Sequence, residues 1–168
     1  MMILTIRLES VAKTAPLSRA VINETMNYYT PLSHDHKSAF ETCLVKVLEI
    51  AAENNCNQIL LLVPQRGMLT GVIEDTLGHK CINALISKKK AFLSPITFFL
   101  QTKRAKPDGF VFGPVLAAYA YIDQLKELDK DKTSPGIVWY TDEPHDLEAF
   151  KKIANVKELD ILFDSETH

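Results

Sequence analysis

Apolar side chains recur at intervals of three and four residues between positions 33 and 55 of this chain. They are Phe40, Cys43, Leu44, Val47, Leu48 and Ala51. This spacing gives a helix one continuous apolar stripe, so we predict a long helix that ends at the polar run "ENN". The run "QILLLV" at 58–63 follows without a polar interruption, which is typical of a central strand that is covered on both faces.

The same two patterns alternate through the rest of the chain. Helical spacing predicts helices at 69–77, with Gly78 at the end, at 118–128, and from Pro144 onward. Short apolar runs predict strands in "CINALI" (81–86), "ITFFLQ" (96–101), "GFVFGPVL" (109–116), "GIVWY" (136–140) and "ELDILF" (158–163). Near the start, alternation predicts a strand at 3–9, and a short helix is expected within 14–29, closed by a tyrosine pair before Pro31.

Alternating strands and helices predict a three-layer αβα sandwich with a mostly parallel central sheet, a Rossmann-like arrangement. The stretch 80–101 has no helical pattern in this interpretation, so we expect an antiparallel excursion there. At 168 residues the chain fits a single α/β domain over 1–168. A domain of this size buries roughly 70% of the surface of its unfolded chain, which is enough for a real core.

Three widely spaced cysteines, Cys43, Cys56 and Cys81, form no metal-ligand or disulfide pattern. We interpret them as buried small apolar residues of a reducing compartment. The charge at Arg7 interrupts the first apolar run before it resembles a signal peptide, and no run approaches the roughly 20 residues of a spanning helix. A cytoplasmic protein without membrane contact is therefore expected.

Charge is distributed unevenly along the chain, although the formal net charge is only −2. Between Asp75 and Asp108 there are seven basic residues and no acidic one, whereas twelve acidic residues face six lysines after Asp108. An acid-free segment of this kind is compatible with an anion-binding face.

In a parallel sheet, ligands gather beyond the carboxyl ends of the strands. Three polar segments follow predicted strands there: "PQRGML", "TKRAKPDG" and "TDEPHD". We therefore predict a ligand-binding site made of Arg66, Gly67, Lys103 and Arg104, because guanidinium and ammonium groups suit phosphate and a glycine lets backbone N–H groups approach it. The expected partner is nucleic acid or a phosphorylated small molecule.

Two alternatives remain open from the residues alone. One is a small-molecule enzyme in which Asp142 and His145 act as an acid–base pair and Arg66 anchors the substrate. The other is a protein-interaction module or homo-oligomer whose acidic C-terminal half meets a basic surface. An acidic first helical turn explains Asp142 and His145 without catalysis, so whether the protein is an enzyme is undecided at this point.

Metal and cofactor motifs are missing from the sequence. No phosphate-binding loop or dinucleotide fingerprint occurs, and no cofactor is expected. The run "SHDHK" places His34, Asp35 and His36 together, but Ser33 or Asp35 as the N-cap of the following helix is the simpler interpretation, and no metal site is predicted. Among the aromatic residues, we expect Trp139 to be core and Tyr140 to be an exposed ring suited to stacking.

Overall fold

The computed structural model describes residues 25–131, 134–153 and 155–162, and the side chains of 129–131 are not described. Within these residues seven strands form one sheet in the order β3-β4-β2-β5-β6-β1-β7. The strands are β1 (Asn27–Tyr29), β2 (Gln58–Leu62), β3 (Lys90–Leu93), β4 (Ile96–Gln101), β5 (Val115–Ala118), β6 (Ile137–Tyr140) and β7 (Val156–Glu158). All neighbouring pairs are parallel except β3 and β4. The predicted mostly parallel sheet is therefore confirmed.

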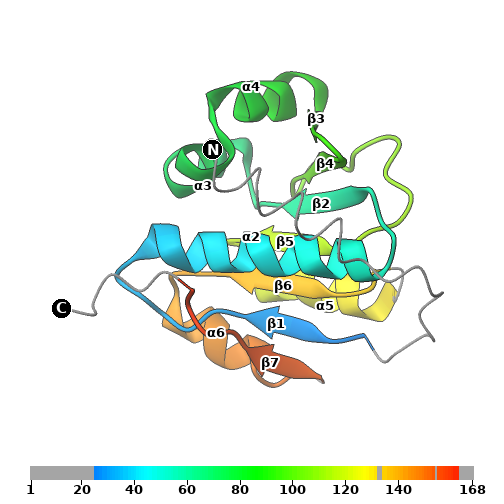
Figure 1. Ribbon diagram of the computed structural model, residues 1–168. Coiled ribbons are helices and arrows are strands. Elements are labelled where there is room, and N and C mark those ends of the chain that lie inside the picture. The colour runs from blue at the N-terminus through cyan, green and yellow to red at the C-terminus, as the bar shows by residue number, and fades with distance from the viewer. Residues whose placement is uncertain (1–24, 132–133, 154, 163–168) are drawn as a thin grey trace.

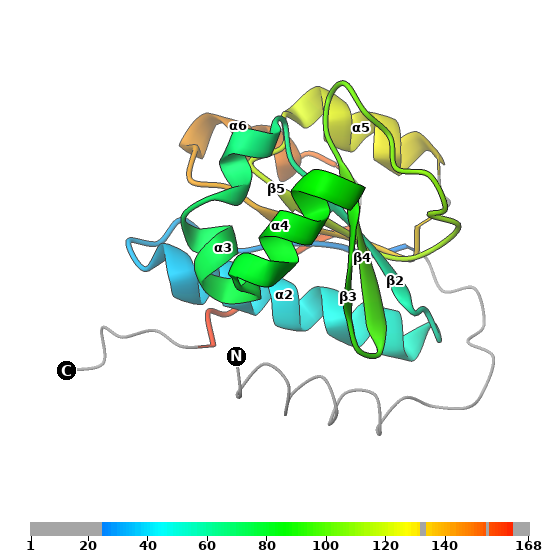
Figure 2. The ribbon, with the colours of Figure 1, turned by 90° about the horizontal axis from the view of Figure 1, so that it is seen from above.

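Helices cover the two faces of the sheet unequally (Figures 1 and 2). They are α2 (His36–Glu53), the 3-10 turn η1 (Arg66–Leu69), α3 (Val72–Leu77), α4 (His79–Lys88), α5 (Ile122–Asp131) and α6 (Pro144–Phe150). α2, α3 and α4 contribute to one buried cluster, and α5 and α6 contribute to the other. We call the first side the closed face and the second side the open face. The layers match the predicted three-layer α/β sandwich.

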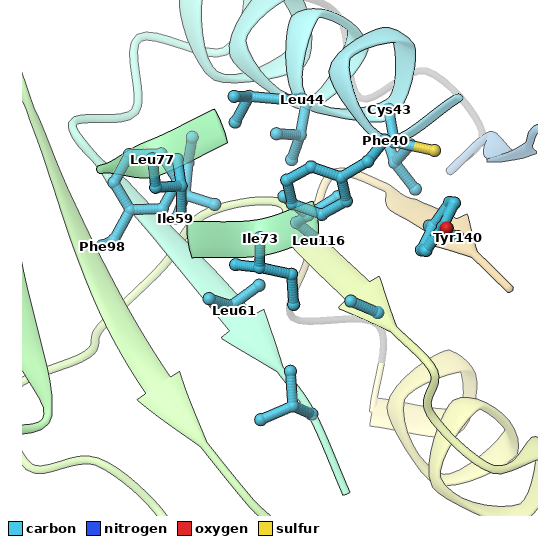
Figure 3. Packing of buried hydrophobic residues seen from close by; sticks show 14 of the residues in the cluster. Phe40, Cys43, Leu44, Ile59, Leu61, Ile73, Leu77, Phe98, Leu116 and Tyr140 are labelled. Atoms are coloured by element: carbon cyan, nitrogen blue, oxygen red, sulfur yellow. The ribbon is translucent and has the colours of Figure 1, made fainter. Parts of the chain in front are cut away.

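The closed face holds the larger core (Figure 3). Phe40, Leu44 and Val47 of α2 are each 0% exposed, because the apolar stripe of the helix lies directly on the strands. Phe40 meets the ring of Tyr140 edge to face at 5.6 Å between centroids. Burial of this continuous stripe stabilises α2, because an isolated helix in water is only marginally stable without such packing.

On the open face, the chain from β4 to β5 crosses β2 without forming a helix within 102–114. The segment contains Pro107, Gly109, Gly113 and Pro114, and this composition disfavours a helix. Phe110 in the segment packs on Phe99 of β4 at 5.7 Å between ring centroids.

Gln58, at the start of β2, holds the crossing segment by accepting hydrogen bonds from the N–H groups of Val111 (2.8 Å) and Phe112 (3.4 Å). A Cβ atom at Gly113 would lie 2.0 Å from the carbonyl oxygen of Gln58, so only glycine permits this approach. The crossing segment is therefore fixed closely against β2.

Several element predictions are confirmed. The long helix, the strands at "QILLLV", "ITFFLQ" and "GIVWY", and the helix after Pro144 all form close to their expected bounds. The expected antiparallel excursion is the β3–β4 pair, whose strands run Lys90–Leu93 and Ile96–Gln101. Gly78 separates α3 from α4 with a φ of 91°.

Other element predictions are wrong. "CINALI" belongs to α4, where Cys81, Ile82 and Leu85 bury one helical face against the closed-face core. The tyrosine pair lies in β1 rather than at the end of a helix. "GFVFGPVL" is a strand only from Val115, and within the described residues the last strand is Val156–Glu158, whereas the pattern predicted 158–163. The strand predicted at 3–9, and the helix predicted within 14–29 as far as residue 24, lie outside the described residues.

None of the helices in the described part of the chain combines the length and the apolar character that crossing a membrane requires.

Candidate anion-binding site

The loops that follow β2 and β4 meet at the carboxyl edge of the sheet, because these two strands are parallel neighbours. The N–H of Val63 donates to the carbonyl of Gln101 at 3.0 Å. One step further, the N–H of Lys103 donates to the carbonyl of Pro64 at 3.3 Å. The basic segment after β4 is therefore bound directly to the segment that leads to Arg66.

Lys103 and Arg104 stand at the tip of a tight turn. The N–H of Thr102 donates to the carbonyl of Ala105 at 3.0 Å, and the N–H of Ala105 donates back to Thr102 at 3.4 Å. Thr102 is buried, whereas both tip residues are exposed. The turn thus presents two adjacent cationic side chains on a backbone that is fixed by its own hydrogen bonds.

A cavity of about 980 Å³ lies between this turn and the first turns of α5. The turn and the end of β4 form one wall, and α5 forms the other, as the two segments lie next to each other in Figure 2. The lining residues are Gln101, Thr102, Lys103, Arg104, Ala105, Lys106, Asp123, Gln124, Lys126, Glu127 and Leu128. We call this cavity the groove.

Positive charge predominates in the groove, with four cationic side chains against the two carboxylates of Asp123 and Glu127. Among the residues that the structure describes, the ion pairs are Lys46–Glu49, His79–Glu74 and Lys151–Glu148. None of these involves the groove, so its cations are not neutralised by direct contact within the described chain. Such a wall attracts anions most strongly at low ionic strength.

Sequence reasoning identified only one wall of the groove. The other wall comes from α5, which contributes Asp123, Lys126 and Glu127. The sequence pattern predicted a helix here but did not place it beside "TKRAKPDG". Strand order explains why α5 lies near the turn: α5 begins just beyond the carboxyl end of β5, and β5 is two positions from β4 in the sheet.

Arg66 and Gly67 lie at the same edge of the sheet but are not among the residues that line the groove. Both are exposed in η1, which leads from β2 toward the closed face. Nothing lies within 4 Å of a Cβ atom built at Gly67, so a ligand can approach the backbone there. The joint role of the four predicted residues stays a prediction.

Asp142 and His145 are both exposed beyond the end of β6. His145 is the second residue of α6, which begins at Pro144. Within the described residues, no hydrogen bond or ion pair joins the two side chains. Their acid–base role, like the alternative of a protein-interaction module or homo-oligomer, stays a prediction.

A tyrosine pair occupies the carboxyl edge near Asp142. Tyr140, expected to be exposed, is 1% exposed, and that prediction is wrong. Its hydroxyl lies 3.3 Å from Nδ1 of His36, and its ring meets Tyr119 at 5.2 Å between centroids. The ring is buried because the side chain of Tyr140 points toward α2, as Figure 3 shows.

Burial raises the pKa of both Tyr119 and Tyr140, and the nearby carboxylate of Asp142 raises them further. Both phenols are therefore neutral near neutral pH and serve as hydrogen-bonding groups rather than bases. Tyr119 also has a φ of 57°, a conformation uncommon for a non-glycine residue. Its N–H bonds the carbonyl of Tyr140 at 3.0 Å, which holds this conformation.

Asp35 is the N-cap of α2, as one of the two expected alternatives stated. Its carboxylate accepts hydrogen bonds from the N–H (3.0 Å) and the hydroxyl (2.7 Å) of Ser38. Across the described residues, no three His, Cys, Asp or Glu side chains are grouped so that they could hold a metal ion.

Comparison of the chain with models of protein families, with curated proteins and with solved structures gave no match. The geometry of the site is therefore the basis for assigning a function.

Proposed function

We propose that this protein binds a phosphate-bearing anion, either nucleic acid or a phosphorylated small molecule, in the groove between the basic turn and α5. The observation that carries the proposal is the pair Lys103 and Arg104 at the tip of a hydrogen-bonded turn, facing a cavity that Lys106 and Lys126 also line. A guanidinium group matches phosphate oxygens in a two-pronged geometry, and the lysines add point charges.

Placement at the carboxyl edge of a parallel sheet supports the same proposal, because ligands of open α/β sheets bind there. Three free cysteines support a reducing environment, and we assign the protein to the cytoplasm within this proposal.

The decisive experiment is a salt titration of binding to a labelled single-stranded oligothymidylate, followed by fluorescence anisotropy. We expect measurable association at low ionic strength and a linear fall of log affinity with log salt concentration. The variant Lys103→Ala/Arg104→Ala should weaken binding at least about tenfold and reduce the salt slope by about one unit for each phosphate contact that is lost.

The matched control is Lys152→Ala/Lys157→Ala, which removes two exposed lysines just before and within β7, the edge strand at the opposite end of the sheet from β4. This variant should bind like the wild type, because it loses the same net charge far from the groove. Equal weakening by both variants would reduce the effect to net charge, and no association of the wild type at low ionic strength would contradict the proposal.

Gly67→Ala tests whether the ligand extends over η1. The empty surroundings of Gly67 leave folding unaffected, so a loss of affinity would place the ligand above residues 66 and 67.

A further inference from the structure

Tyr121 has an exposed aromatic ring, and its backbone is hydrogen-bonded to Gln124, a residue that lines the groove. The side chain is 51% exposed, and the residue immediately precedes α5, whose Asp123 and Gln124 line the groove. Lys126 of the same wall lies five residues further, which is about 7.5 Å along a helix axis. The ring thus lies at the start of the α5 wall, which carries Asp123, Lys126 and Glu127, while the other three cationic residues line the opposite wall.

The backbone of Tyr121 is fixed. Its carbonyl accepts hydrogen bonds from the N–H groups of Gln124 (3.0 Å) and Leu125 (3.3 Å), which makes it the N-cap of α5. Its own N–H donates to the side-chain oxygen of Gln124 at 3.1 Å. This is one half of a capping box, in which the third helical residue reaches back to the N-cap.

The choice of residue at this position is unusual for helix stability. Ser, Thr, Asp and Asn are preferred at the N-cap because their short side chains accept a hydrogen bond from the first helical turn, which a tyrosine ring cannot do. The exposed part of the ring also adds little to the core. A half-exposed aromatic ring is therefore held at the start of the α5 wall of the groove, at a position where helix capping does not favour it.

We infer that Tyr121 is a stacking platform for a nucleobase, so that the anion bound in the groove is a nucleotide unit with its phosphate on the basic wall. The inference rests on the proposed function and names its ligand class. Aromatic rings beside cationic grooves stack bases without sequence preference, because every base has a π-face. The shared chemistry is a base joined to a phosphate, whether it comes from a single strand or from a free nucleotide.

The test compares two anions that differ in their bases. One probe is a labelled oligothymidylate of about 15 nucleotides, and the other is inorganic polyphosphate, which carries charge but no base. Tyr121→Ala should weaken oligothymidylate binding roughly 5- to 150-fold, the range for the loss of one stacking contact. It should leave polyphosphate binding unchanged, and Tyr121→Phe should restore oligothymidylate binding because the ring is retained.

Phe92→Ala is the matched control, since Phe92 is 68% exposed and pairs with Thr97, four residues before Gln101 of the groove. It removes an exposed ring about 13 Å along the strand from the groove, and oligothymidylate should bind it as it binds the wild type. Thermal unfolding of each variant checks that the fold is intact.

The outcomes separate the two proposals. If the wild type binds both probes and Tyr121→Ala binds oligothymidylate equally well, the stacking inference is overturned while the anion-binding proposal stands. If the wild type binds neither probe at low ionic strength, both are overturned. Competition by adenosine monophosphate distinguishes the two sources of the ligand. If adenosine monophosphate displaces the labelled oligothymidylate, the ligand is a free nucleotide; if it does not, the ligand is a single strand. In both cases the base stacks on Tyr121.

Discussion

The closed and open faces of the sheet differ in the elements that cover them. On the closed face, three helices cover the strands and bury a large apolar cluster. On the open face, α5 and α6 meet only part of the sheet, and the crossing segment 102–114 covers β2 and β4 in place of a helix. A thin segment fills less space than a helix, and the groove forms between this segment and α5. The closed face therefore holds the larger buried core, and the open face carries the groove that we propose as the binding surface.

The largest expected effect comes from the closed face. Phe40→Ala removes a fully buried ring that packs against Tyr140, so the free energy of unfolding should fall by about 3–5 kcal/mol. Urea unfolding followed by circular dichroism measures it. A loss below about 1 kcal/mol would mean that the closed face is not the main source of stability.

Alkaline pH should also act on the closed face. Burial raises the pKa of Cys43 to about 12, whereas an unfolded cysteine titrates near 8.5. Above about pH 8.5 the unfolded chain loses this proton and the folded chain keeps it, so the free energy of unfolding should fall by up to about 1.4 kcal/mol per pH unit. The full stabilisation is present below the unfolded pKa.

Urea unfolding at a series of alkaline pH values checks this effect, with Cys43→Ala as the control. The variant should show a shallower dependence of the free energy of unfolding on pH, because it lacks the Cys43 thiol. Some dependence should remain, because other groups, including Tyr140, still titrate. Identical slopes for the two proteins would exclude Cys43 as a source.

The open face should tolerate a comparable change better. Phe110 is only partly buried on Phe99, so Phe110→Ala should lower the free energy of unfolding by about 1–2 kcal/mol. Phe112, at 45% exposure, is its neighbour and control, and Phe112→Ala should stay within about 0.5 kcal/mol. A Phe110 effect as large as that of Phe40 would remove the distinction between the faces.

The smallest effects concern the helix caps. Asp35 caps α2 with two hydrogen bonds to Ser38, so Asp35→Ala should destabilise the protein by about 1 kcal/mol. Gln124 makes the exposed cap contact of α5, and Gln124→Ala should cost only about 0.3 kcal/mol. Thermal unfolding compares the two variants, and a reversed order would show that the open face depends on its helix start more than the closed face does.

Strong patterns made much of the fold predictable from sequence. The stripe from Phe40 to Ala51 and the run at 58–63 each allow one structure, because a long helical period and an unbroken apolar strand are distinct signals. The strand prediction for "CINALI" is wrong because six residues are too few to distinguish a helical period from a strand period. The helical pattern is recognisable only when the residues before it, Leu77 and Gly78, are included. Strand order depends on packing between distant segments, which no local pattern contains.

The candidate site was predictable in part for the same reason. Lys103 and Arg104 follow a strand whose direction the pattern indicated, so their position at the carboxyl edge could be expected. The burial of Tyr140 was not predictable from its neighbour Asp142, because it depends on the packing of α2 over the ring through Phe40. Tyr121 was assigned to a helical stripe, although it precedes α5 and is exposed.

The turn at Thr102–Ala105 is held by main-chain groups alone, through its own two hydrogen bonds and the bond from Lys103 to Pro64. The identity of its tip residues is therefore independent of the folding of the sheet, unlike Gly113, where any larger residue collides with β2. Mutation can exchange the two cationic side chains for others while the scaffold persists. Under the proposed function, the ligand preference can therefore change while the fold is kept.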